Sequence, residues 1–125
     1  MRFPYEILRA VVKDPYKFDI NLIPPYVKGV ISAFRDFVKD FYDKSVCPFS
    51  LMYKVVDSLH NVIEEDNPDK LLFYFGDFSY YLGVIREEYK MKNISAVFVD
   101  KMQYSCASFV VRKLFDVWRR NFLKK

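Results

Sequence analysis

The sequence has few of the residues on which most catalytic sites depend. Threonine is absent, and Gln103 and His60 are the only glutamine and the only histidine. The three glycines, Gly29, Gly76 and Gly83, are scattered, so the chain has no glycine-rich loop of the kind that cradles phosphate. Catalytic signatures such as G-x-S-x-G and H-E-x-x-H are also missing. The sequence therefore predicts a protein without catalytic activity.

Cysteine is scarce too. Cys47 and Cys106 lie far apart and belong to no C-x-x-C or Cys/His cluster, so we expect neither a structural zinc nor any other metal or cofactor. We interpret both as buried thiols, since a disulfide is credible only in a hyperthermophile. His60 lies at the edge of an apolar helix face and is interpreted as a packed residue, with Asp57 and Glu64 expected to point elsewhere. A Cys–His pair brought together by the fold stays open as an alternative.

Acidic residues are concentrated in one stretch, but without the spacing of a calcium loop. Carboxylates before and just inside a helix N-terminus stabilise the helix dipole, which explains this group more simply than a cation site does. Its members are Glu64, Glu65, Asp66 and Asp69.

Long uncharged apolar runs are absent. The N-terminal stretch MRFPYEILRAVVKDP is too short and too interrupted for a secretory signal, and no segment approaches the roughly 18 apolar residues of a membrane span. We expect a cytoplasmic protein that is not secreted. Sparse amides beside abundant Lys and Glu are typical of thermophilic proteins, with codon bias as the alternative explanation.

Hydrophobic residues make up 52% of the 125 residues and aromatic residues 19%, which is enough to build one buried core. Apolar periodicity and proline positions predict a single all-α domain, a compact bundle over residues 1–125. The five expected helices span about 4–13, 25–44, 48–65, 68–90 and 94–122, the last beginning instead at 101 if Asp100 and Gln103 form a capping box. Residues 14–24 are expected to be extended, and the charged outer face of 25–44, including Asp40, to be solvated.

The helix at 68–90 is predicted to be central. Its main seam has the spacing of a helix packed lengthwise, and consists of Leu71, Phe75, Phe78, Leu82, Ile85 and Tyr89. Phe73, Tyr80 and Val84 supply a further apolar side, so we expect other helices to surround it. Gly76 and Gly83 each cost the helix about 1 kcal/mol relative to alanine. They predict a flat face that touches another helix backbone, within the chain or across a dimer.

The net charge of +4 comes from the C-terminal end. On a helical wheel the basic residues cover one side: Arg112, Lys113, Arg119, Arg120 and Lys124. The opposite side is apolar and is expected to anchor the helix to the core through Val111, Leu114, Phe115, Trp118 and Phe122. A basic face of this kind suits phosphates, although basic residues in the last turns also complement the helix dipole. A basic amphipathic helix can also lie on anionic lipid, but we do not expect a membrane surface as the partner.

The leading hypothesis is therefore an accessory protein that binds nucleic acid or a nucleoprotein assembly through its basic C-terminal helix. The alternative is a protein–protein interaction module, such as a viral or host-factor-binding bundle, with the basic helix merely solvated and a homodimer seam at Gly76 and Gly83. A third hypothesis is an enzyme that uses Cys47, Cys106 or His60. No motif in the chain is specific to one protein family.

Overall fold

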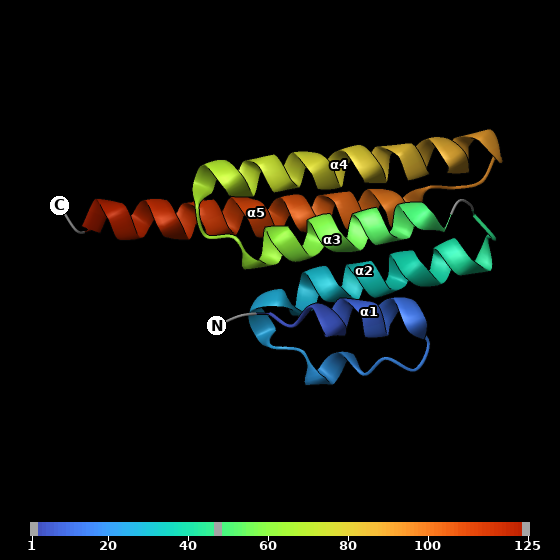
Figure 1. Ribbon diagram of the computed structural model, residues 1–125, viewed down its shortest axis with the longest axis horizontal. Helices are drawn as coiled ribbons and strands as arrows, with labels where there is room; N and C mark the ends of the chain where they lie inside the picture. Colours follow the sequence, from blue (N-terminus) through green and yellow to red (C-terminus); the bar gives the residue numbers. More distant parts are fainter. Residues whose placement is uncertain (1–2, 47–48, 124–125) are drawn as a thin grey trace.

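The computed structural model describes residues 3–46 and 49–123, and over these ranges it contains five α-helices, one 3-10 turn and no strand (Figure 1). The elements are α1 (Tyr5–Lys13), η1 (Ile20–Leu22), α2 (Pro25–Asp43), α3 (Ser50–Glu64), α4 (Pro68–Met91) and α5 (Val97–Leu123). The all-α prediction is confirmed, and the expected bounds differ from these by only a few residues.

The four longer helices lie lengthwise beside one another in an elongated bundle (Figure 1). α3 packs against α4, α4 against α5, and α5 against α2, while α1 packs on α2 and α3. Figure 1 places α1 on the side of the molecule opposite α4 and shows α5 running beyond the other helices towards the C-terminus.

Local signals explain where the helices begin and end. Asn67 caps α4, because its Oδ1 accepts hydrogen bonds from the backbone N–H groups of Asp69 (3.0 Å) and Lys70 (3.1 Å). At the other end Asn93 adopts a left-handed backbone, φ 57°, and Ile94 N donates to the carbonyl oxygen of Tyr89 at 3.1 Å. This is a Schellman motif, which satisfies carbonyls that the last turn leaves unpaired.

The core is rich in aromatic rings. In α2, the rings of Phe34, Phe37 and Phe41 follow one another at 6.3 and 6.1 Å between centroids, and all three are buried. Asp40 lies beside them and is also buried, so its predicted place on the solvated face is wrong. Its carboxylate accepts hydrogen bonds from the Tyr89 hydroxyl at 2.8 Å and from Lys44 Nζ at 3.0 Å, which offsets the cost of burying the charge.

The seam predicted for α4 is confirmed: all its members are buried except Phe75, which is partly buried. The expectation that other helices surround α4 is wrong. Phe73 and Tyr80 are each 67% exposed, because α3 and α5, the helices that pack most extensively on α4, lie on its other side. Gly76 and Gly83 lie on the same open face, and no described residue comes within 4 Å of a Cβ built at either glycine. The predicted contact with a helix backbone of the same chain is therefore not observed among the described residues.

α5 is continuous from Val97, so the predicted capping box does not form. Asp100 instead accepts a hydrogen bond from Arg86 Nε at 2.8 Å, and Gln103 donates to the hydroxyl of Ser79 at 2.9 Å. Both side chains join α5 to α4. In the stretch expected to be extended, Ile20–Leu22 forms one 3-10 turn. No helix in the described ranges is long and apolar enough to cross a membrane.

Candidate interaction surface

The C-terminal part of α5 projects from the bundle. Lys113 still contacts another helix: its Nζ donates hydrogen bonds to the carbonyl oxygens of Val62 and Ile63 in the last turn of α3. The described basic residues that follow it in α5 make no such contact. From Leu114 the helix continues to Leu123, roughly 15 Å further at 1.5 Å per residue. In Figure 1 this part of α5 lies to the left of the other helices.

An apolar stripe runs along the outer side of α5. Its members are spaced by seven, four, three and four residues, the spacing of a coiled-coil seam, and each is between 57% and 76% exposed: Tyr104, Val111, Phe115, Trp118 and Phe122. We call this set the α5 stripe. Phe115 and Trp118 lie 5.9 Å apart between ring centroids, and Trp118 stacks on Phe122 at 5.5 Å.

The predicted anchoring of these residues to the core is wrong. Of that set, only Leu114 packs against the core, while Val111, Phe115, Trp118 and Phe122 are exposed. For Phe115, Trp118 and Phe122 the reason is length: α3 ends at Glu64 and α4 begins at Pro68, so the described helices stop near the level of Lys113. Val111 lies before that level, on the outer side of α5. Contiguous exposed aromatics are uncommon on monomeric soluble proteins and mark interaction surfaces.

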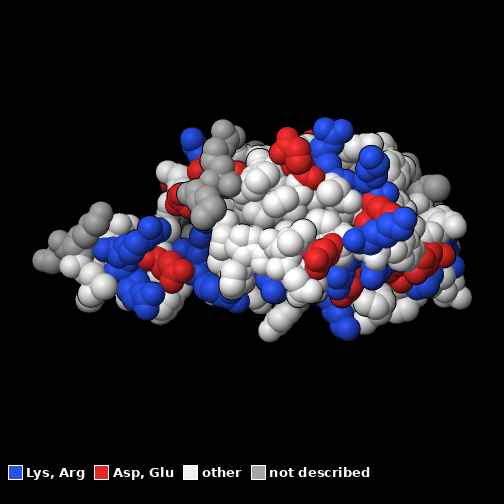
Figure 2. Space-filling model, turned by 90° about the horizontal axis from the view of Figure 1, so that it is seen from below, with Lys and Arg blue, Asp and Glu red and all other residues white. Residues whose placement is uncertain are grey.

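The predicted basic face is only partly present. Arg112 is exposed just before the projecting part of α5, and Arg119 and Arg120 are exposed on it. Arg119 forms an ion pair with Asp116 at 3.5 Å. Figure 2 shows this end as a narrow protrusion on which blue basic side chains surround a smaller red acidic group. Lys124 lies outside the described residues.

Lys113 does not belong to that exposed face. Its Nζ lies 3.1 Å from the oxygen of Val62, 2.6 Å from that of Ile63, and 3.7 Å from Asp66 Oδ1. Burial lowers the pKa of Lys113, and the nearby carboxylates, Asp66 first among them, oppose that shift. Lys113 therefore caps the C-terminus of α3 and is not available to bind an anion.

The open side of α4 is a second uncovered surface. Phe73, Gly76, Tyr80 and Gly83 alternate along it at spacings of three and four residues, with Asp69 and Glu87 extending the same line at its two ends. We call these six residues the α4 outer face. It presents two exposed rings and two glycines that no described residue covers.

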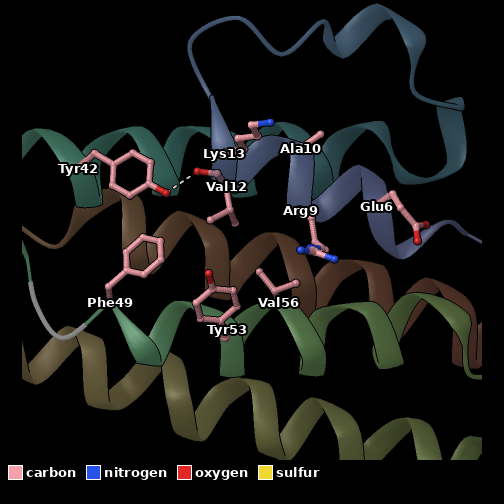
Figure 3. Close-up of a pocket in the computed structure, with 9 residues that line it drawn as sticks. All are labelled: Glu6, Arg9, Ala10, Val12, Lys13, Tyr42, Phe49, Tyr53 and Val56. Atoms are coloured by element: carbon pink, nitrogen blue, oxygen red, sulfur yellow. Dashed lines mark hydrogen bonds between the residues drawn. The ribbon is translucent and has the colours of Figure 1, made fainter.

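A cleft of about 560 Å³ lies between α1, α2 and α3 (Figure 3). Tyr42 and Phe49 stack at 6.0 Å between centroids, Tyr53 meets Phe49 edge-on at 5.5 Å, and the Tyr42 hydroxyl donates to the carbonyl oxygen of Val12. Side chains of α1 and α3 complete the lining of the cleft. The full set of described lining residues is Glu6, Arg9, Ala10, Val12, Lys13, Tyr42, Phe49, Tyr53 and Val56. This set can hold a small amphipathic molecule, but its described members include no nucleophile–base pair.

His60 is packed as predicted, although its surroundings differ from the expectation. Nε2 donates to the carbonyl oxygen of Phe3 at 2.9 Å, and the ring of Tyr5 meets the imidazole edge-on at 5.2 Å. Glu64 does not point elsewhere: its Oε1 lies 3.5 Å from Nε2, one helical turn further along α3. The rule that residues four apart share a helix face was the sequence signal for this pair.

The remaining candidates have no reactive neighbours among the residues described. Cys106 is fully buried, and burial raises the pKa of its thiol, whereas Cys47 lies outside the described ranges. In the acidic stretch, Glu65 Oε2 accepts from the backbone N–H groups of Asp66 (3.1 Å) and Asn67 (3.4 Å). Within residues 3–46 and 49–123 no group of three or more potential ligands is placed to hold a metal ion.

Comparison of the chain with protein family models, with curated proteins and with solved structures finds no match.

Proposed function

We propose that this protein is a non-catalytic helical adaptor that binds a protein partner through the outer side of α5. The α5 stripe carries the proposal, because exposed Phe115, Trp118 and Phe122 continue along a helix that extends past the rest of the bundle. Large aromatic side chains contribute much of the binding energy in protein interfaces. Heptad spacing of the stripe suits a helix of the partner laid alongside it.

The contacts within the stripe and the charges beside it also support a role in binding. Its rings contact one another, as the 5.9 and 5.5 Å centroid distances show, and are flanked by the exposed arginines Arg112 and Arg119. An apolar centre with a charged rim is the usual arrangement of a protein interface.

Affinity capture from native cells tests this function. We expect the wild-type chain to retain a set of proteins that the Phe115→Ser/Trp118→Ser variant loses, also after nuclease treatment. Leu22→Ser is the matched control, because Leu22 is just as exposed but lies on η1, away from α5. If the double variant retains the same proteins as the control, the stripe is not the binding surface.

A second candidate function is nucleic-acid binding by the same part of α5. The specific observation in its favour is that Arg112, Arg119 and Arg120 are exposed beside exposed rings, a combination that binds single strands by charge and stacking. Asp116 weakens it by pairing with Arg119, and Lys113 removes one expected cation.

Charge reversal separates the two functions. Arg119→Glu/Arg120→Glu should weaken oligonucleotide binding for every sequence alike, because these residues reach phosphates and not base edges. Three phosphate contacts give a slope of log K against log salt of roughly −2 to −3. Lys17→Glu/Lys54→Glu changes the net charge equally at exposed sites elsewhere and should have little effect. Equal binding by both double variants would remove this candidate.

A further inference from the structure

We infer that the α5 stripe of one copy of this protein docks on the α4 outer face of a second copy. The inference rests on the proposed function and names one partner of the stripe: another molecule of the same chain. The docked pair is a helix-on-helix contact between two surfaces that the described chain leaves uncovered.

The two surfaces cannot meet within one molecule. α4 and α5 of the same chain already pack against each other, and residues that join them, such as Gln103 and Ser79, lie on other sides of these helices. Leu82 and Ile85 of α4 and Met102 and Cys106 of α5 are buried. The stripe and the α4 outer face point away from those buried sides, so only a second copy can bring them together.

The spacing of large and small residues is complementary. Phe115 and Phe122 lie seven residues apart, about 10.5 Å along the helix, and so do Gly76 and Gly83. Two projecting rings therefore match two positions where α4 has no side chain, in the manner of knobs entering holes. Glycine lets the backbones approach closely.

Charge favours this pairing over pairing of two α5 stripes. Arg112 and Arg119 flank the stripe on one side, so two stripes laid antiparallel would place arginines beside arginines. The α4 outer face instead ends in Asp69 and Glu87, and Asp77 lies on its flank. Lys70 lies on the margin of this face, whereas Lys90 continues its line one turn beyond Glu87, which leaves three carboxylates to one lysine along it.

A contact of this type is heterologous, because different surfaces of the two copies meet. If each copy places its α5 on the other's α4, the contact forms twice around a twofold axis and closes into a dimer. Two contacts also bring the buried surface towards the roughly 1,200 Å² that a stable interface needs.

Sedimentation equilibrium under reducing conditions tests the inference. We expect wild-type chain to self-associate with increasing concentration. Trp118→Ser should raise the dissociation constant at least about 30-fold, as loss of a central interface aromatic does. Leu22→Ser should leave it unchanged.

Gly76→Leu is the decisive variant, because it cannot act by unfolding the chain. No described residue lies within 4 Å of a Cβ at this position, and leucine favours helix more than glycine does. This variant should be monomeric and at least as stable as wild type. If it associates as wild type does, α4 is not the docking site and the inference is wrong.

Mixing the two variants distinguishes this contact from pairing of two stripes. Trp118→Ser keeps an intact α4 outer face and Gly76→Leu keeps an intact stripe, so an equimolar mixture should regain one contact in a 1:1 complex. No complex in the mixture, or a monomeric wild-type chain at about 1 mM, overturns the inference. Neither result affects the capture experiment. That experiment tests the proposed function separately, because it compares which other proteins the wild-type chain and the Phe115→Ser/Trp118→Ser variant retain.

Discussion

Lys113 and Arg112 are neighbours in sequence with opposite roles. Lys113 Nζ donates to two carbonyl oxygens at the end of α3, at 3.1 and 2.6 Å, while Arg112 is exposed and forms no ion pair with a described residue. Lys113→Met keeps most of the side-chain stem but removes both bonds. We expect the free energy of unfolding to fall by about 1.5–3 kcal/mol, the range for hydrogen bonds to a charged group.

Urea unfolding followed by circular dichroism measures this difference, with Arg112→Met as the control. An exposed side chain without partners should change stability by less than about 0.5 kcal/mol. Equal effects of the two substitutions would show that Lys113 does not cap α3.

At the residue scale, the sequence was least informative about polar groups that meet across helices. Asp40 was placed on a solvated face because α2 alone gives no sign of Tyr89, whose hydroxyl lies 2.8 Å away but 49 positions later. Lys113 was placed on the basic face for the same reason. Such pairs depend on how helices are juxtaposed, which periodicity does not specify.

At the scale of the element, helix positions could be predicted because their signals are local. Pro68 after Asn67 begins α4, Asn93 ends it, and the buried seam from Leu71 to Tyr89 follows from apolar periodicity alone. These features need no knowledge of the other helices.

Which apolar faces of each helix are buried by neighbouring helices could not be predicted in the same way. The apolar residues of α4 and α5 exceed what their neighbours bury, and periodicity does not distinguish a face that meets the core from one that awaits a partner. Phe73 and Trp118 were therefore both assigned to the interior, and both are exposed. The sequence placed the candidate interaction surface on the basic side of the last helix, whereas the exposed rings of α5 lie on the side that was expected to anchor it to the core.

Across the whole molecule, several buried or hydrogen-bonded acids resist losing their protons in the folded state. Burial raises the pKa of Tyr89 and Tyr42 above the ordinary 10.0, with the bond to Asp40 adding to the shift of Tyr89. Burial, followed by the hydrogen bond to Asp57, raises the pKa of Tyr5 to about 12. Burial likewise raises the pKa of Cys106 above 9.0.

These shifts predict alkaline unfolding with a definite sign. Above about pH 9 to 10 the unfolded chain releases protons that the folded chain retains, so the free energy of unfolding falls as the pH rises. Lys113 acts oppositely, because its lowered pKa makes the folded state gain stability as pH rises towards its ordinary 10.5. The hydrogen bond to Asp43 also raises the pKa of Tyr16. Four tyrosines and a cysteine therefore outweigh the one lysine, and the free energy of unfolding shows a net decrease.

Urea unfolding at pH 7, 9, 10 and 11 should therefore show stability declining from about pH 9, most steeply above 10. Tyr89→Phe tests the origin of the decline, since phenylalanine fills the same space without a titratable proton. The variant should be less stable than wild type at pH 7 by about 1 kcal/mol, the net worth of one hydrogen bond. Its stability should then fall less between pH 9 and 11, because one of the groups that drives the loss is gone. Parallel declines in the two proteins would mean that Tyr89 titrates alike in the folded and unfolded chains, which its buried bond to Asp40 argues against.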